Sequence, residues 1–107
     1  MKIRLVSLAP GTPRVRNIIN KLPAALGRDP DADVRLDDSW VSRFHCEISE
    51  ISGNLLVRDL GSTNGTLVNG KQVDESHLLP GDLLTVGLTI FRVQYKRSRK
   101  TSLATIC

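Results

Sequence analysis

Short apolar runs separated by turn residues dominate this chain, and no window of helical length carries a convincing period of 3.6 residues. Alternation at period two is clearest over residues 33–36 and 44–49, and it is typical of half-buried strands. In the second segment Phe44, Cys46 and Ile48 would share one face of a strand. We expect further strands over residues 3–8, 15–21, 24–28, 55–60, 67–68, 72–73, 83–86 and 90–95.

Glycine, proline and asparagine separate these runs. Residues 52–54 and the pair Asn69-Gly70 are typical hairpin turns, and residues 80–82 form another turn signal. About ten short strands at intervals of roughly eight to twelve residues predict an all-β chain folded as an antiparallel sandwich. Loops gather at the ends of such sandwiches, so loops that are distant in sequence can meet in space.

The composition fits one domain. A chain of 107 residues can bury a single core, and with few aromatic residues this core must be mainly aliphatic. Patterning stops after residue 95, so we expect a domain over 1–95 and a basic linker or flexible tail over 96–107. The net charge of +4 belongs to four cations of this tail, because the other 11 basic residues balance 11 acidic ones. An anion site in the body must therefore be built from a few aimed groups.

Cofactors and membrane insertion are not expected. Cys46 and Cys107 form neither a disulfide framework nor, with histidine, a zinc spacing. No apolar stretch approaches the roughly 20 residues of a membrane helix, and no secretory signal begins the chain. We expect a cytoplasmic protein without a metal or a small-molecule substrate.

The loop 59–66, Asp-Leu-Gly-Ser-Thr-Asn-Gly-Thr, concentrates hydroxyls, an amide and two glycines between apolar runs. Earlier polar segments are Gly27-Arg28 and Ser42-Arg43 with His45. In this order, the set resembles the forkhead-associated (FHA) domain over about residues 1–95. The resemblance implies a β-sandwich of about eleven strands, of the FHA/SMAD type, that binds phosphothreonine peptides at loops on one end.

The resemblance also implies a role for each motif residue. Arg28, Ser42 and Thr63 would contact the phosphate, with Arg43 as an auxiliary cation, and Asn64 would bind the peptide main chain. The residues expected to support the site are Gly27, His45, Gly61, Gly65 and Asn69. The chemistry agrees, because arginine offers a permanently charged fork of donors and phosphothreonine carries about −1.5 to −2 charge.

The predicted function is a signalling module that mediates protein–protein interaction by binding phosphothreonine, without enzymatic activity. Two enzymatic alternatives are weaker. Residues 65–72 nearly match a nucleotide-binding loop, but Gln72 replaces its Ser or Thr. Ser42, His45 and Asp59 could form a nucleophilic triad only if the fold brought them together.

Two other interactions remain open. A sandwich could bind a partner without phosphate through an apolar surface that includes Trp40, which we expect to be partly buried. The tail could contact nucleic acid, a weaker possibility because such runs are usually solvated. The expected partner is a phosphothreonine-containing protein, and we expect a monomer or one part of a larger multidomain protein.

Overall fold

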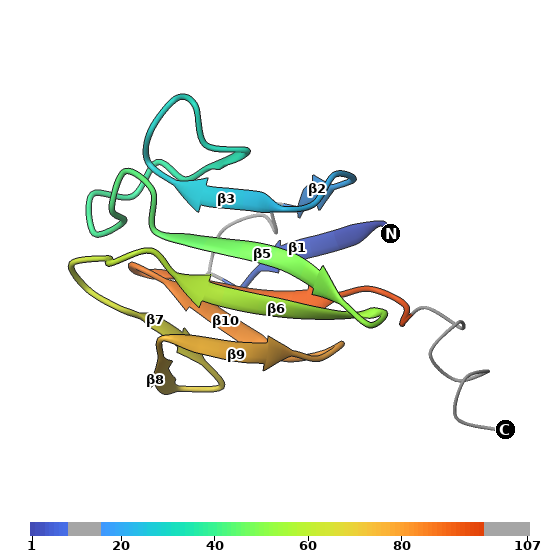
Figure 1. The fold of residues 1–107 in the computed structure, drawn as a ribbon. Coiled ribbons are helices and arrows are strands. Elements are labelled where there is room, and N and C mark those ends of the chain that lie inside the picture. The colour runs from blue at the N-terminus through green and yellow to red at the C-terminus, as the bar shows by residue number, and fades with distance from the viewer. Residues whose placement is uncertain (9–15, 98–107) are drawn as a thin grey trace, which may run out of the picture.

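A computed structural model describes residues 1–8 and 16–97 and shows two β-sheets packed face to face (Figure 1). This confirms the predicted all-β sandwich. Neighbouring strands run antiparallel except β3 and β4, which are parallel. The six-stranded sheet contains, in spatial order, β2 (Arg16–Ile19), β1 (Ile3–Ser7), β11 (Thr89–Gln94), β10 (Leu83–Val86), β7 (Thr66–Val68) and β8 (Lys71–Val73). The five-stranded sheet contains β4 (Val34–Arg35), β3 (Ala24–Gly27), β5 (Cys46–Ile51), β6 (Asn54–Asp59) and β9 (Glu75–Leu78).

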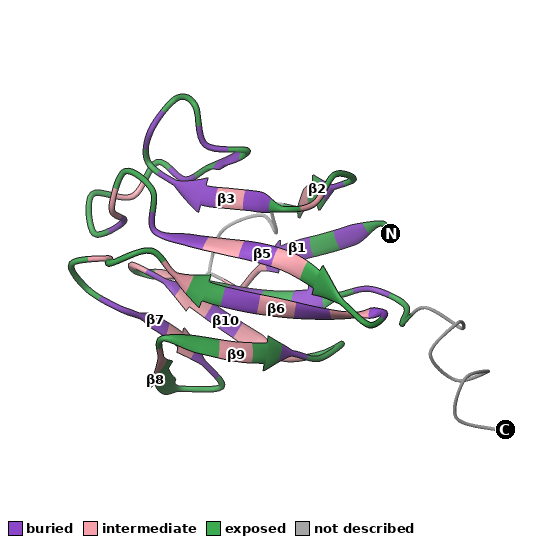
Figure 2. Cartoon of the chain, viewed as in Figure 1, coloured by how far each residue is buried: buried purple, intermediate pink, exposed green. Residues whose placement is uncertain are grey.

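The core lies between the sheets and is mainly aliphatic. Inward residues alternate with outward ones along β6, β7, β10 and β11, which gives the striped burial pattern of Figure 2. Phe91 of β11 is the largest fully buried side chain, and it packs in one cluster with Leu5 of the same sheet and Ile48 and Leu55 of the facing sheet. This packing holds the ends of the two sheets, and thus their loops, in a defined arrangement.

The start of β5 differs from the prediction. The strand begins at Cys46, so Phe44 does not join Cys46 and Ile48 on the core face and is 43% exposed. His45 is instead fully buried. A buried imidazole is tolerated here because both ring nitrogens have hydrogen-bond partners. Trp40, expected to be partly buried, is 53% exposed.

The two hairpin predictions are confirmed. Ser52 and Gly53 adopt φ angles of 50° and 81°, and Asn69 and Gly70 adopt 51° and 82°. Two successive positive φ angles match the twist of the flanking strands, which is why asparagine and glycine are favoured there. Strand β9 was not predicted separately, because its sequence Glu-Ser-His-Leu carries little β signal. Antiparallel pairing with β6 holds these residues in the strand conformation instead.

The loops after β3, β4 and β6 gather at one end of the sandwich, whereas the N-terminus lies at the opposite end (Figure 1). Most of the predicted tail, residues 98–107, lies outside the described residues. Within the described part of the chain, no helix is long and apolar enough to cross a membrane.

Candidate functional site

Gly27 lets two backbones approach closely at the loop end. Beyond β3, the Arg28 N–H donates to the Ser42 carbonyl at 3.1 Å and the Asp29 N–H to the Arg43 carbonyl at 3.0 Å. A Cβ atom at Gly27 would lie 1.9 Å from the Arg43 carbonyl oxygen. Only glycine fits this position, and its absent side chain places Arg28 beside Ser42.

His45 connects the same segment to the loop 59–66. Its Nδ1 atom accepts the Ser42 N–H at 3.1 Å, and its Nε2 atom lies 2.8 Å from the Gly65 carbonyl oxygen. The network assigns the proton to Nε2, which donates to that carbonyl. His45 therefore holds two loops together from inside the protein, and its full burial keeps it away from any ligand.

The Asp59 carboxylate organises the loop 59–66 from within. One oxygen accepts the N–H groups of Gly61 and Ser62, each at 3.0 Å, and the other accepts the hydroxyls of Ser62 and Thr66. Burial raises the pKa of Asp59, but these hydrogen bonds outweigh it and hold the pKa below its ordinary value. The backbone bends through positive φ angles at Gly61 (77°) and Gly65 (87°).

Two hydrogen bonds of exposed residues also join the loop 59–66 to the loop that contains Ser42. The Thr63 N–H donates to the Ser42 hydroxyl oxygen at 3.0 Å, which leaves the Ser42 O–H available as a donor. The Asn64 amide nitrogen donates to the Trp40 carbonyl at 2.8 Å. Thr63 and Asn64 are both exposed, so their side chains face solvent beside Ser42.

The two arginines differ in how they are held. The Arg28 Nε atom donates to the Val41 carbonyl at 3.1 Å, and within the described residues its guanidinium makes no ion pair. Arg43 instead pairs with Asp29 at 2.6 Å. The pKa of Asp29 is lowered, first by the N–H of Asp31 and then by Arg43. Part of the Arg43 charge is thus neutralised, and its role as an auxiliary cation stays a prediction.

Asp38 fixes the position of the neighbouring loop. Its carboxylate accepts the backbone N–H groups of Trp40 and Leu88, each at 2.8 Å, and also the Thr89 hydroxyl. Burial raises the pKa of Asp38, and these hydrogen bonds lower it by more. A Cβ atom at Gly87 would lie 2.9 Å from this carboxylate, so the turn between β10 and β11 docks closely against the loop.

Asn69 lies apart from the other predicted site residues. It follows β7 at the end opposite the loop 59–66, and its amide nitrogen donates to Asp82 at 3.1 Å. Its amide oxygen accepts the Leu83 N–H at 2.9 Å. These contacts stabilise the hairpin and the start of β10, so they give no support to a site at the other end.

Neither enzymatic alternative matches this geometry. In a nucleophilic triad the Ser42 hydroxyl would bond to His45, but His45 contacts the Ser42 backbone and Asp59 bonds to Ser62 and Thr66. Residues 65–72 form a β-hairpin, whereas a nucleotide-binding loop must open a helix.

Sequence reasoning missed the structural role of the three aspartates that build the loops, Asp29, Asp38 and Asp59. Asp59 was considered only as a member of a nucleophilic triad. Asp38 and Asp59 each accept an N–H from two residues further along the chain, at Trp40 and Gly61. Aspartate followed by a polar or glycine-containing turn is the local signal of such a contact. The sequence contains this local signal, but it does not show which distant residues, such as Thr66 and Leu88, bind the same carboxylates.

Comparison with known proteins decides the family. The FHA domain model matches residues 25–87, which is more than half of the chain. The chain belongs to the FHA domain family. The FHA domain of CT664 from Chlamydia trachomatis superimposes with a TM-score of 0.80 and 28% identity, covering 90% of this chain and 99% of that chain.

Two further relatives extend the FHA comparison. The glycogen accumulation regulator GarA of Mycolicibacterium smegmatis is 42% identical over 72 residues, which cover 67% of this chain and 46% of GarA. The chain thus matches about half the length of this relative. The yeast Dun1 FHA domain, solved with a doubly phosphorylated peptide derived from Rad53, gives a TM-score of 0.76 at 28% identity, covering 91% of this chain and 76% of that chain.

Proposed function

We propose that this FHA domain binds phosphothreonine-containing segments of protein partners at the loop end of the sandwich and thereby mediates regulated protein–protein interaction. The observation that carries the proposal is the exposed Arg28 guanidinium, which makes no ion pair within the described residues, on a backbone bonded to Ser42. The hydroxyl of Ser42 in turn accepts the Thr63 N–H. The relative solved with a phosphorylated peptide supports it. The names of relatives, a regulator and an oxoglutarate dehydrogenase inhibitor, support a regulatory role without catalysis.

Each residue at the site has a defined task in this proposal. The terminal nitrogens of Arg28 bind two phosphate oxygens, while the hydroxyls of Ser42 and Thr63 donate to the third. Asn64 keeps one amide hydrogen and its oxygen for the peptide main chain, because its other amide hydrogen goes to Trp40. Arg43 adds a longer-range electrostatic attraction for the phosphate.

The affinity expected from these contacts is moderate. Hydrogen bonds to charged groups contribute about 1.5–3 kcal/mol each, and ordering the peptide offsets part of the gain. Three or four such bonds are compatible with a Kd near 1 μM, which corresponds to about −8 kcal/mol. Tighter binding would need additional surface beside the phosphate.

The test is calorimetry with a degenerate phosphothreonine peptide library and its unphosphorylated counterpart. We expect binding of the phosphorylated library only, and a loss of most of this binding in Arg28→Ala. Arg58→Ala is the matched control, because Arg58 pairs with Glu47 on the outer face of the five-stranded sheet. Equal binding of both libraries would refute the proposal, as would an unchanged affinity in Arg28→Ala.

A second candidate function is binding that needs no phosphate. Trp40 and Leu88 are 53% and 71% exposed, and the Asp38 carboxylate holds their backbones together beside Asn64. Two exposed apolar side chains at a loop end favour contact with an apolar group of a partner. Binding that survives phosphatase treatment of the partner but is lost in Trp40→Ala would establish this function.

A further inference from the structure

The two sheets of the sandwich differ in charge. The strands of the six-stranded sheet contain no Asp or Glu, whereas those of the five-stranded sheet contain four. This segregation is invisible in the sequence, where the body of the chain is neutral. The acidic residues of the five-stranded sheet are Glu47, Glu50, Asp59 and Glu75.

The register of the six-stranded sheet brings three arginines together on its outer face. Arg16 of β2 and Arg92 of β11 both pair with Val6 of β1, so they flank it on neighbouring strands. Arg4 lies two residues before Val6 and points to the same face. Strand spacing places the backbones of Arg16 and Arg92 about 10 Å apart, and Arg4 about 7 Å from Val6 along β1. We call Arg4, Arg16 and Arg92 the arginine face.

Within the described residues, no acidic side chain forms an ion pair with the arginine face. The ion pairs of the described residues are Arg43 with Asp29 and Arg58 with Glu47, and neither includes this face. Residues 9–15 and 98–107 contain no Asp or Glu in the sequence, so they hold no carboxylate side chain that could pair with it. Arg92 donates one guanidinium N–H to the Gly81 carbonyl oxygen, at an N···O distance of 3.1 Å. All three arginines are exposed.

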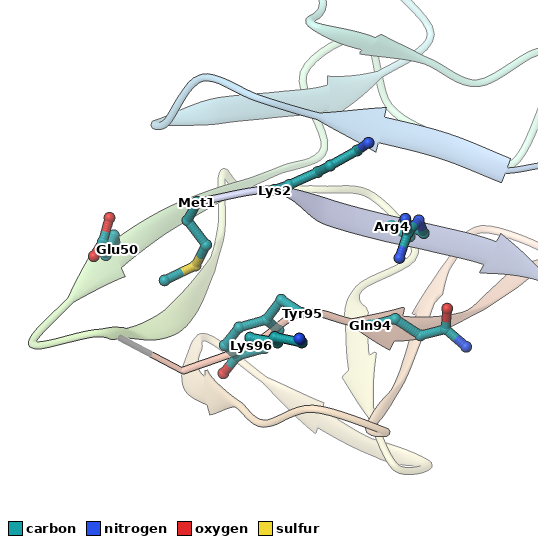
Figure 3. A pocket seen from close by; sticks show the side chains of 7 residues that line it. All are labelled: Met1, Lys2, Arg4, Glu50, Gln94, Tyr95 and Lys96. Atoms are coloured by element: carbon teal, nitrogen blue, oxygen red, sulfur yellow. The ribbon is translucent and has the colours of Figure 1, made fainter. Parts of the chain in front are cut away.

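The positive region continues into a cavity of about 640 Å³ at the end of the sandwich that contains the N-terminus. Arg4 lines this cavity together with Lys2 and Lys96 (Figure 3). One carboxylate, that of Glu50, also lines it and lies across the cavity from Arg4. The cavity thus adds two lysines to the three arginines and opposes them with one acid.

Aliphatic side chains accompany these cations. Ile18 pairs with Arg4 and is 50% exposed, and Ile90 of β11 is 42% exposed on the same face. Enrichment in arginine and depletion of Asp and Glu are typical of protein interfaces. The outward positions of these strands carry no aromatic residue, which disfavours single-stranded nucleic acid, since its bases stack on aromatic rings.

We propose that the arginine face binds an acidic surface of a protein partner, independently of the phosphothreonine site at the loop end. The outer face of the sheet fits an amphipathic acidic helix, because carboxylates seven residues apart on a helix are separated by about 10 Å, the spacing of Arg16 and Arg92. The aliphatic side chains of such a helix would cover Ile18 and Ile90.

The probe is an amphipathic helical peptide of about 20 residues that carries glutamates on one face with leucines between them. The comparison peptide has glutamine in place of each glutamate. The test variant is R4Q/R16Q/R92Q. The matched control is K21Q/R58Q/K71Q, which removes the same charge from positions outside both the arginine face and the phosphothreonine site. Circular dichroism and retained phosphopeptide binding establish that both variants fold.

We expect the glutamate peptide to bind the natural chain and the glutamine peptide to bind at least tenfold more weakly. Each exposed ion pair contributes a factor of about 1.5 to 5, so the test variant should bind the glutamate peptide about tenfold more weakly. The control should change less than twofold. Equal losses in both variants, or no binding to the natural chain, would overturn the proposal.

Two competitors test the class of partner. A duplex oligonucleotide and vesicles of phosphatidylserine with phosphatidylcholine should each displace the glutamate peptide only weakly. If either binds the natural chain more tightly than the peptide and loses this binding in R4Q/R16Q/R92Q, the face belongs to nucleic acid or to membrane, and the protein-partner proposal fails.

Discussion

Gly27→Ala is the substitution whose effect can be worked out most directly from the structure. The new Cβ atom would lie 1.9 Å from the Arg43 carbonyl oxygen and 2.7 Å from its carbonyl carbon. A carbon and an oxygen in contact normally stay about 3.3 Å apart, so the two backbones must separate by about 1.4 Å. The obstacles are backbone atoms, which no rotation of a side chain can move away.

This separation would break the hydrogen bonds that hold Arg28 beside Ser42. The bonds from Arg28 N–H to Ser42 and from Asp29 N–H to Arg43, at 3.1 and 3.0 Å, would exceed bonding distance. Each is worth about 0.5–1.5 kcal/mol, and overpacking adds about 1–3 kcal/mol. We expect the free energy of unfolding to fall by about 2–6 kcal/mol.

Phosphopeptide affinity should fall as well, by about 10- to 100-fold, because one charge-assisted hydrogen bond is worth about 1.5–3 kcal/mol. Denaturant unfolding followed by circular dichroism measures the stability, and fluorescence polarisation with a labelled phosphothreonine peptide measures the affinity under conditions where the variant is folded. Gly70→Ala is the control. It has a φ angle of 82° and open space around it, so it should cost about 1 kcal/mol without changing affinity. If Gly27→Ala keeps both stability and affinity, the close approach is not what builds the site.

Three further predictions concern other residues. The lowered pKa values of Asp38 and Asp59 contribute stability that is fully present above the ordinary aspartate pKa of about 3.9 and is lost as the pH falls through the lowered pKa values of the folded state. The unfolding midpoint should therefore depend less steeply on acid pH in Asp59→Asn, and an identical pH dependence would contradict the assignment. Asn69→Ala should lower stability by about 1–3 kcal/mol, through its positive φ angle and lost hydrogen bonds, yet leave phosphopeptide affinity unchanged in polarisation assays. Burial raises the pKa of the Cys46 thiol to about 12, so in Cys107→Ser the folded chain should resist iodoacetamide at pH 8, and rapid alkylation monitored by mass spectrometry would show that the core opens.

The candidate site was predictable from sequence as a set of residues but not as an arrangement. The order of Gly27, Arg28, Ser42 and the loop 59–66 identified the family. The pairing of Arg43 with Asp29 could not be predicted, because it depends on two backbones meeting where Gly27 allows it. The spacing of residues along the chain does not show which two backbone segments come into contact.

The separation of Asn69 from the site has the same origin. Asparagine followed by glycine predicts a hairpin turn, and the turn forms. Which end of the sandwich the turn occupies depends on the direction of β7. The burial of His45 is likewise a result of packing, since a period-two pattern would have placed it on the solvent face.

The sequence by itself determined the all-β class, the hairpins and the motif residues, because alternation and turn residues act through neighbouring backbone angles. Only the tertiary structure decided which groups meet. Strand register places Arg4, Arg16 and Arg92 together on one outer face, although the body of the chain is neutral in sequence. Charges that are far apart along the chain become neighbours through pairing and packing, and these long-range contacts are set by the fold as a whole.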